Sequence, residues 1–358
     1  MSKSFIFVLF DTGESDFLQP VLRELNQDTF KLLLFGTSET LSILSTFPQI
    51  KSSELNLTEP VTKDWPREKE LPENDLNLIL SEISDYHVCI TGVASILQGQ
   101  ILKSLNSKKI MIWDNFKGND TGDYWRTALQ VQLLADIVIY PSQFTYEELP
   151  VKPKDYFIAG CPPVEEWELM IKNIDSDAVR QKLAITRKVI LYIAGWSGDP
   201  ECREGTELFA LICREYLSKL LNDYEIIIQL HPRSDGDFER NEFGDLGRVN
   251  SRYICSLEEI TSTASLVVCH KTTAGPKISA AGKKLIFVVP QSGYSNKLIE
   301  QNICPLVKNC EEFKNSFEND IIDLNKNDVY SAFQMPKNSK KNLALLLMNS
   351  LSSQNEVS

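Results

Sequence analysis

The sequence predicts an α/β protein of two Rossmann-like domains that face each other across a cleft. Along the chain, short apolar segments rich in β-branched residues alternate with longer amphipathic segments. This alternation stops at a charged stretch over 165–187 and then begins again. Repeated strand–helix–strand order gives parallel sheets with right-handed crossovers, and 358 residues are enough for two domains with separate cores.

The first domain is expected over 1–164. It begins with a strand over 4–10, because this run is continuously apolar. A helix is expected next, over 17–25, where the apolar side chains share one helical face. Further strands are expected over 30–35, 87–91, 109–113, 136–140 and 156–160, with helices over 98–105 and 124–134. The polar segment 52–74, with three prolines, is expected to be a long surface excursion.

The second domain is expected over 165–336, after a linker near 160–177. Its strands are expected over 188–193, 225–230, 253–254, 265–269 and 285–289, and its helices over 204–221, 256–262 and 275–281. The remaining residues, 337–358, are expected to form a helix and a tail. The helix has an apolar stripe of Leu343, Leu346, Leu347 and Leu351, which suits packing back on the first domain.

Composition narrows the function classes. The formal net charge of −12 argues against a nucleic-acid partner, because proteins that bind nucleic acids usually carry an excess of basic residues. No stretch reaches the roughly 18 apolar residues of a membrane-spanning helix, and the first apolar run is too short for a signal peptide. The 8 cysteines form no CxxC pair and are expected to be reduced and buried, in a cytoplasmic protein. With only 3 histidines, no metal site is expected.

In open parallel sheets, ligands bind beyond the carboxyl ends of the strands, where helix N-termini also favour phosphate. In the first domain, Gly13 allows a tight turn inside the acidic segment 11–16. Asp11, Glu14 or Asp16 could supply a carboxylate base for a sugar hydroxyl. Asp114 also follows a predicted strand. The alternative for this loop is ordinary helix capping by Ser15 or Asp16.

Two loops of the second domain carry ligand-binding residue types. Gly195 and Ser197 let a ligand approach the backbone, and Trp196 between them can stack on a base or a sugar. The alternative is a plain turn with a core tryptophan. After the next strand, His231 can act as donor or base and Arg233 can bind phosphate, unless the histidine is satisfied by backbone groups.

A third loop of the second domain precedes the helix over 275–281. Thr272 and Thr273 would form a phosphate-binding turn with the helix N-terminus. His270, Lys271 and Lys277 add donors and charge around it. The alternative is N-capping by a threonine next to ordinary surface lysines.

At these residues the chain resembles the UDP-N-acetylglucosamine 2-epimerases and related glycosyltransferases of the GT-B fold. The segment 10–25 is similar to the opening of that family, and Gly-Cys-Pro-Pro-Val over 160–164 is similar to its Gly-Asn-Pro-Val. His231 and Pro232 resemble its His-Pro, and Gly282 with Lys283 matches its Gly-Lys within the similar segment 272–286. The resemblance implies a GT-B fold and a nucleotide-sugar ligand.

The chain also departs from this family. The family has an arginine in the first loop, where this chain has the acidic segment 11–16. Its Ser-Gly-Gly turn is replaced by Lys271, Thr272 and Thr273. The family glutamate that holds the ribose hydroxyls falls on Lys277, which has donors only and would pair with a phosphate instead.

We therefore expect a metal-independent glycosyltransferase that moves a sugar from a nucleotide-diphosphate sugar to an unknown acceptor. The nucleotide would lie on the second domain, where helix dipole and positive side chains would stabilise the leaving diphosphate. Catalytic groups would come from Asp11, Glu14, Asp114 and His231. No cofactor other than the nucleotide-sugar substrate is expected.

Three alternatives remain open from the sequence. One is a nucleotide-sugar-binding protein that has lost catalysis, which the irregular motif residues favour. Another is a sugar-nucleotide epimerase with an acid–base pair of carboxylates around Asp114 and Asp123. The last is a phosphotransferase of the capsule or teichoic-acid type.

Overall fold

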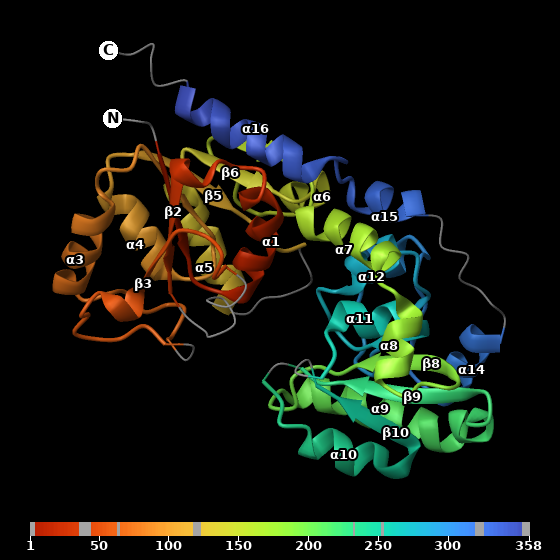
Figure 1. Ribbon diagram of the computed structural model, residues 1–358. Coiled ribbons are helices and arrows are strands. Elements are labelled where there is room, and N and C mark those ends of the chain that lie inside the picture. Colours follow the sequence, from red (N-terminus) through yellow and green to blue (C-terminus); the bar gives the residue numbers. More distant parts are fainter. Residues whose placement is uncertain are drawn as a thin grey trace. The chain divides into compact units, whose positions relative to one another are not determined.

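The computed structural model of the chain describes residues 4–35, 44–62, 65–116, 123–231, 233–251, 254–318 and 326–352. The chain divides into two compact units (Figure 1). Unit 1 comprises Met1–Pro163 together with Phe333–Ser358, and unit 2 comprises Val164–Ala332. The C-terminal residues therefore belong to the same compact unit as the N-terminal ones.

Unit 1 is built on a seven-stranded sheet in the order β3-β2-β1-β4-β5-β6-β7, and every pairing in it is parallel. Its strands are β1 (Phe5–Leu9), β2 (Phe30–Leu34), β3 (Gln49–Lys51), β4 (Val88–Thr91), β5 (Lys108–Ile112), β6 (Ile137–Tyr140) and β7 (Tyr156–Ile158). Its helices are α1 (Thr12–Leu22), α3 (Glu73–Ile83), α4 (Ile96–Ser104), α5 (Asp123–Val131), α6 (Gln143–Glu147) and α16 (Ser339–Ser352), with short 3-10 turns η1 (Gln27–Thr29), η2 (Ser52–Glu54) and η3 (Gln132–Leu134). The helix α7 (Pro162–Asn173) carries the chain into unit 2.

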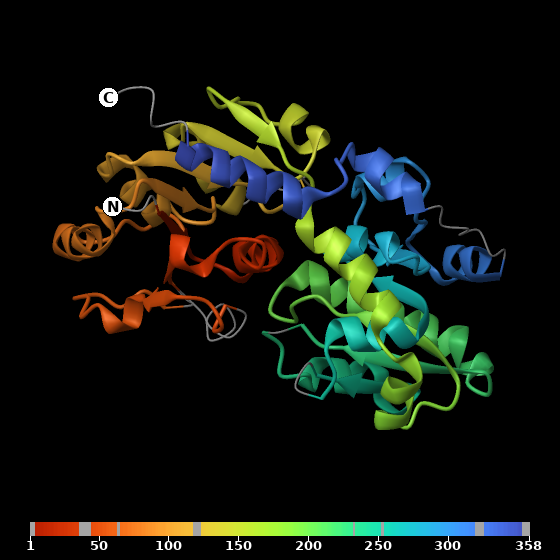
Figure 2. The ribbon, with the colours of Figure 1, turned by 45° about the horizontal axis from the view of Figure 1, so that its top comes forward.

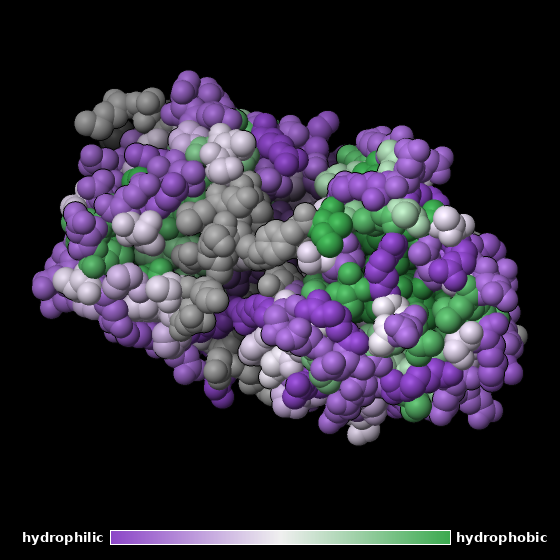
Figure 3. Space-filling model, turned by 60° about the horizontal axis from the view of Figure 1, so that its bottom comes forward, coloured by the Kyte–Doolittle hydropathy of each residue, from purple (hydrophilic) through white to green (hydrophobic). Residues whose placement is uncertain are grey.

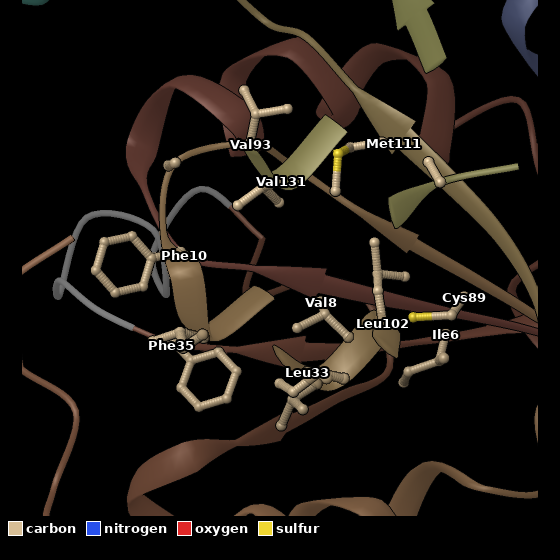
Figure 4. Close-up of a cluster of buried hydrophobic side chains, with 14 of the residues drawn as sticks. Ile6, Val8, Phe10, Leu33, Phe35, Cys89, Val93, Leu102, Met111 and Val131 are labelled. Carbon is tan, nitrogen blue, oxygen red and sulfur yellow. The ribbon is translucent and has the colours of Figure 1, made fainter. Parts of the chain in front are cut away.

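Helices cover both faces of the unit 1 sheet because successive strand residues point to opposite sides. On one side, Val8, Leu33 and Met111 pack against Leu102 of α4 and Val131 of α5 (Figure 4). The other side is covered by α1 and α16, which pack together and present their own buried leucines and phenylalanine. Figure 2 shows α16, the blue helix near the C-terminus, lying along unit 1.

Unit 2 is built on a six-stranded, fully parallel sheet in the order β10-β9-β8-β11-β12-β13. Its strands are β8 (Lys188–Ile193), β9 (Tyr224–Gln229), β10 (Gly247–Asn250), β11 (Ala264–Cys269), β12 (Leu285–Val288) and β13 (Leu306–Val307). Its helices are α8 (Ser176–Lys182), α9 (Pro200–Glu215), α10 (Asp237–Phe243), α11 (Leu257–Thr263), α12 (Gly275–Ala280), α13 (Lys297–Glu300), α14 (Cys310–Glu318) and α15 (Lys326–Phe333), with 3-10 turns η4 (Leu217–Leu220) and η5 (Gly244–Leu246).

An aromatic cluster joins the unit 2 sheet to the helices on one of its faces. Tyr192 of β8 stacks on Phe209 of α9 with ring centres 4.6 Å apart, and Phe243 of α10 lies 5.8 Å from Tyr192. Phe313 of α14 completes the cluster, 6.0 Å from Phe209. Such ring pairs add to the stability that burial of apolar area already gives, so α9, α10 and α14 are held to one face of the sheet.

The two parallel sheets with flanking helices confirm the predicted α/β class. Several local expectations need correction. The helix expected over 17–25 begins at Thr12, because Asp11 caps it. The strand expected over 253–254 is not where the unit 2 edge strand lies: β10 is earlier, at Gly247–Asn250, and Tyr253 is outside the described residues. The segment 52–74 is not merely a surface excursion, since Val61, Trp65 and Leu71 are buried in the unit 1 core.

No helix in the described ranges is long and apolar enough to cross a bilayer. Hydrophilic side chains cover most of the face shown in Figure 3, with hydrophobic ones between them. None of the eight cysteines, all of them in the described part, forms a disulfide, and burial raises the pKa of Cys89 to about 12.

Gly160→Ala should destabilise unit 1 strongly. Gly160 has φ +89°, and a Cβ there would lie 2.5 Å from the Pro336 carbonyl oxygen and 2.7 Å from Cβ of Ser339. Backbone strain and the clash together should lower the free energy of unfolding by about 2–4 kcal/mol, measured by urea denaturation.

Gly293→Ala is the matched control for this substitution. Gly293 has a similar φ of +82°, but nothing lies within 4 Å of the position of its Cβ. It should therefore lose only the backbone contribution, about 1 kcal/mol. Equal losses for the two variants would show that the Pro336 contact does not constrain this turn.

Candidate functional site

Each sheet reverses its strand order once, and ligands of doubly wound sheets bind at such a reversal. In unit 1 the reversal lies between β1 and β4, and in unit 2 it lies between β8 and β11. The loops that leave these strands turn toward helices on opposite faces. The predicted site residues Asp11, Gly13 and Glu14 follow β1, whereas Gly195 and His270 follow the reversal strands of unit 2.

At the unit 1 reversal, a capping box begins α1. The Asp11 carboxylate accepts a 3.2 Å hydrogen bond from the Glu14 backbone N–H. In return, Glu14 accepts from the Asp11 N–H at 3.5 Å and from the Phe10 N–H at 2.8 Å. The cap is thus Asp11, not Ser15 or Asp16; the Ser15 hydroxyl donates back to the Asp11 carbonyl at 3.1 Å.

The Glu14 carboxylate also crosses to the loop after β4. It accepts from the Ala94 N–H at 3.1 Å, and the Gln98 amide donates to both of its oxygens at 3.0 and 3.1 Å. A Cβ on Gly92 would lie 1.8 Å from Glu14 Oε1, so this approach requires glycine. Glu14 is buried, and its side chain fills the place between the two loops.

Two further carboxylates lie beside Glu14. A Cβ on Gly13 would lie 2.3 Å from Asp114 Oδ2, so the Asp114 carboxylate rests against the first turn of α1. Burial raises the pKa of Glu14 well above its usual value, and the charges of Asp11 and Asp114 raise it further. Hydrogen bonds from the Phe10 and Ala94 N–H groups oppose this rise in pKa. The unit 1 reversal is therefore acidic.

Arg67 is a site residue that the sequence did not reveal. Its guanidinium donates to Asp11 Oδ2 at 3.2 Å and to the Ala94 carbonyl at 2.8 Å. It comes from the segment 52–74, which carries no periodic signal. Gln98 begins the helix expected over 98–105, but nothing in the local sequence indicates that its amide binds Glu14. The one available clue was electrostatic: an acidic loop followed by a second strand-end carboxylate requires a cation from elsewhere in the chain.

In unit 2, the loop after β8 presents an exposed tryptophan. Asp199 caps α9 by accepting from the Glu201 N–H at 2.9 Å. Trp196 is 40% exposed, and a Cβ on Gly198 would lie 2.4 Å from its Cζ2 atom, so the indole rests against the Gly198 backbone. Gly195 lies equally close to Cys202, since its Cβ would be 2.5 Å from Sγ.

The loops after β8 and β9 are tied together. Ser234 Oγ accepts from the Ser197 N–H at 3.2 Å and lies 3.0 Å from the Ser197 hydroxyl, which donates to it. The Arg233 guanidinium carbon lies 5.5 Å from the centre of the Trp196 ring. The structure thus brings together four predicted site residues. These are Trp196, Ser197, Arg233 and His231, the last of which is hydrogen-bonded to the Arg233 backbone.

His231 is half-buried at the end of β9. Its Nδ1 accepts a 3.1 Å hydrogen bond from the Arg233 N–H, which assigns the ring proton to Nε2. Burial lowers the pKa of His231, and the Arg233 charge lowers it further. The imidazole is therefore neutral at neutral pH, with one N–H to donate.

The loop after β11 places its predicted residues in different surroundings. Lys271 forms an ion pair with Glu201 of α9, and Thr273 is exposed. The Thr272 hydroxyl accepts from the Ala274 N–H at 3.1 Å within the loop. The N-cap of α12 is Ala274, and no side chain caps it, so the threonine N-capping set out as the alternative is not found. The Lys277 ammonium lies 5.8 Å from the Trp167 ring centre.

His270 is a packing residue in this structure. It is buried against α9, where a Cβ on Gly205 would lie 2.3 Å from the imidazole Cδ2. Its Nε2 lies 3.1 Å from the side-chain oxygen of Gln291. Burial lowers the pKa of His270, so the imidazole is neutral at neutral pH and can stay packed against α9. Among the described residues, no group of three or more His, Cys, Asp or Glu could hold a metal ion.

Comparison with solved structures decides the fold family. A UDP-GlcNAc 2-epimerase from Neisseria meningitidis, solved with UDP-GlcNAc bound, matches with a TM-score of 0.65 and 14% identity over 98% of this chain and 100% of that one. The UDP-GlcNAc 2-epimerase of Methanocaldococcus jannaschii matches with a TM-score of 0.64 and 12% identity over 97% and 99%. The wall teichoic acid polymerase TagF matches with 0.61 and 12% over 99% and 90%. The chain adopts the GT-B fold.

These identities are low enough that the likeness shows the GT-B fold alone. No protein-family model matches the sequence, and no curated protein matches it either. Within the GT-B fold, the two reversal points of this chain differ in chemistry. That of unit 1 is filled by Glu14 and is acidic, whereas that of unit 2 presents Trp196, Arg233 and Lys271.

Glu239 on α10 leads to a prediction about the pH dependence of stability. It is buried, and neither carboxylate oxygen has a hydrogen-bond partner within the described ranges. Burial raises the pKa of Glu239, and Asp235 adds to the rise, while Arg240 and Arg203 oppose it. Because the pKa is raised in the folded state, this group favours folding most below the usual value of 4.5 and progressively less as pH rises toward the folded pKa.

Glu239→Gln should therefore stabilise the protein at about pH 8 by about 1 kcal/mol or more, because a neutral amide costs less to bury than a carboxylate, although it too would lack hydrogen-bond partners. At about pH 4.5 the gain should shrink, because Glu239 in the folded wild type is then mostly protonated and no longer carries a buried charge. Urea denaturation at the two pH values measures this difference. Glu207→Gln, on an exposed position of α9, is the control and should change neither value. A pH-independent gain would contradict the assignment.

Proposed function

We propose that this chain binds a nucleotide-diphosphate sugar at the strand-order reversal of unit 2 and transfers the sugar to an acceptor without a metal ion. The observation that carries this proposal is the pair of tied loops after β8 and β9, which holds an exposed indole and an exposed guanidinium side by side. A nucleotide sugar offers a ring and a phosphate, which are the partners that these two groups favour. Solved structures of the same fold with bound UDP-GlcNAc or UDP support it.

Positive charge for the diphosphate would come from Arg233 and Lys271. Asp199 and Glu201 occupy the start of α9, so the N-terminus of that helix is not the expected phosphate site. The resemblance to the epimerase family suggested that Lys277 would pair with a phosphate, but its ammonium has the Trp167 ring as a neighbour. Thr273 is exposed next to Lys271 and would add a hydroxyl donor, while His231 would donate its Nε2 proton to an oxygen of the leaving group.

The transfer also needs a base for the acceptor hydroxyl. Of the three carboxylates described above at the unit 1 reversal, Glu14 is buried and hydrogen-bonded on both oxygens, and Asp11 is held by Arg67 and by the helix cap. Asp114 is part-exposed, so of the three it is the one open to a hydroxyl group. In the transfer, the acceptor oxygen bonds to the anomeric carbon, its proton passes to a carboxylate base, and the nucleoside diphosphate leaves with the electron pair of the broken bond.

Calorimetric titration with UDP, GDP, CDP and their sugars tests the proposal, followed by product analysis. Binding together with transfer or slow hydrolysis of the sugar nucleotide supports a transferase. Interconversion of epimers would instead support an epimerase, and binding without turnover would support a protein that only binds. Failure of all these ligands to bind would remove the basis of the proposal.

Arg233→Ala, and Thr272→Ala combined with Thr273→Ala, should each weaken binding of the nucleotide by about 1–3 kcal/mol, the range for a lost hydrogen bond to a charged group. Because the Thr272 hydroxyl also accepts from the Ala274 N–H inside the loop, Thr273→Ala alone should be measured beside the pair. Arg214→Ala, which removes a positive charge at the other end of α9, is the control and should bind as wild type. Unchanged affinity in both variants would place the site elsewhere.

A further inference from the structure

Trp196 differs from the other tryptophans of the chain. Trp65, Trp113 and Trp167 are at most 6% exposed, and Trp125 packs against Trp113 with ring centres 5.4 Å apart. Trp196 is 40% exposed, so it is not a core residue. Leaving that much of an indole in water forgoes the free energy that its burial would provide. The position is therefore better explained by a partner outside the chain than by packing.

The loop fixes the indole instead of leaving it loose. The backbone of Gly198 lies against the Cζ2 and Cε2 atoms, where any side chain would clash. Ser197, the next residue, is hydrogen-bonded to Ser234 through both its N–H and its hydroxyl. A ring held in this way is available for stacking without a large loss of conformational entropy on binding.

Arg233 is held differently. Its backbone N–H donates to His231 Nδ1, but its side chain is exposed. The guanidinium lies 5.5 Å from the Trp196 ring centre, near the outer limit of about 6 Å for a cation–π contact. Such a contact at an exposed site contributes only about 0.5–1 kcal/mol. A phosphate that binds the guanidinium can therefore draw it away from the indole at small cost.

We infer that Trp196 and Arg233 form one subsite for a phosphorylated nucleoside or sugar. The base or the sugar ring stacks on the indole, and Arg233 turns from the indole to the phosphate of the same nucleoside or sugar. This inference rests on the proposed function, because a nucleotide sugar has two such groups, the nucleoside phosphate and the sugar phosphate. The nucleoside offers the flat face of its base and the sugar offers an apolar C–H face, and each also carries a phosphate. The subsite requires only a face that can stack and a phosphate.

Tryptophan fluorescence and calorimetry on the full chain test the inference. The probes are UMP, GMP and CMP for the nucleoside side, and N-acetylglucosamine 1-phosphate for the sugar side. We expect one of these two classes to change the fluorescence of the wild type, and that class identifies the ring. The unphosphorylated nucleoside or sugar of that class should bind at least about tenfold more weakly, because Arg233 then has no anion to bind.

The variants separate Trp196 from the other fluorophores. Trp196→Phe keeps a ring, so it should bind the same probe within a few-fold but lose the fluorescence change. Trp196→Ala should bind it about tenfold more weakly. Trp65→Phe, a buried residue of unit 1, is the matched control and should keep both the affinity and the signal. Without ligand, Arg233→Ala should make the tryptophan emission more sensitive to acrylamide.

Two results would overturn the inference, and they differ in what they say of the proposed function. If nucleotide sugars bind by calorimetry while Trp196→Ala binds them as tightly as the wild type, the subsite is refuted and the proposed function stands. If none of the phosphorylated probes and none of the nucleotide sugars binds, both are refuted.

Discussion

A parallel sheet whose strand order reverses imposes one constraint on everything near the reversal. The two strands at that point send their connections to opposite faces, so their loops part at the carboxyl edge. In this chain the constraint acts twice, between β1 and β4 and between β8 and β11. The side chains that lie between these two loops then determine which kind of group each unit can bind there.

In unit 1 the chain fills that place itself. The Glu14 carboxylate receives backbone N–H groups from both loops and the Gln98 amide as well, so it joins the ends of β1 and β4 as a ligand otherwise would. Asp11 and Asp114 add negative charge, which Arg67 offsets in part. A phosphate would meet repulsion here, whereas a hydroxyl that must lose a proton would find acceptors. The acidic reversal of unit 1 is thus less suited to a phosphate than the reversal of unit 2, which presents Arg233 and Lys271.

Sequence periodicity was sufficient to predict the α/β class and most strands of the two sheets. The strand expected over 188–193 is β8, Lys188–Ile193. A short, continuous apolar run between polar segments is typical of a buried strand in an α/β protein. It was also sufficient to place Trp196 and Arg233 at strand ends. It could not supply Arg67 or Gln98, because their partners lie 56 and 84 positions away along the chain. Nor could it show that His270 is held under α9, since that depends on Gly205 allowing the helix to approach the ring.

Lys271 illustrates why an occupied side chain can still serve a ligand. It is paired with Glu201, and the two side chains are 33% and 57% exposed. At such exposure, water and salt already weaken the attraction, and an ion pair of this kind contributes about 0–1 kcal/mol. A diphosphate carries more charge than one carboxylate and would also be drawn to Arg233, so it can compete for Lys271 at little cost. Glu14 is the opposite case: its hydrogen bonds are buried, breaking them would leave unsatisfied groups in the core, and it therefore stays where the fold puts it.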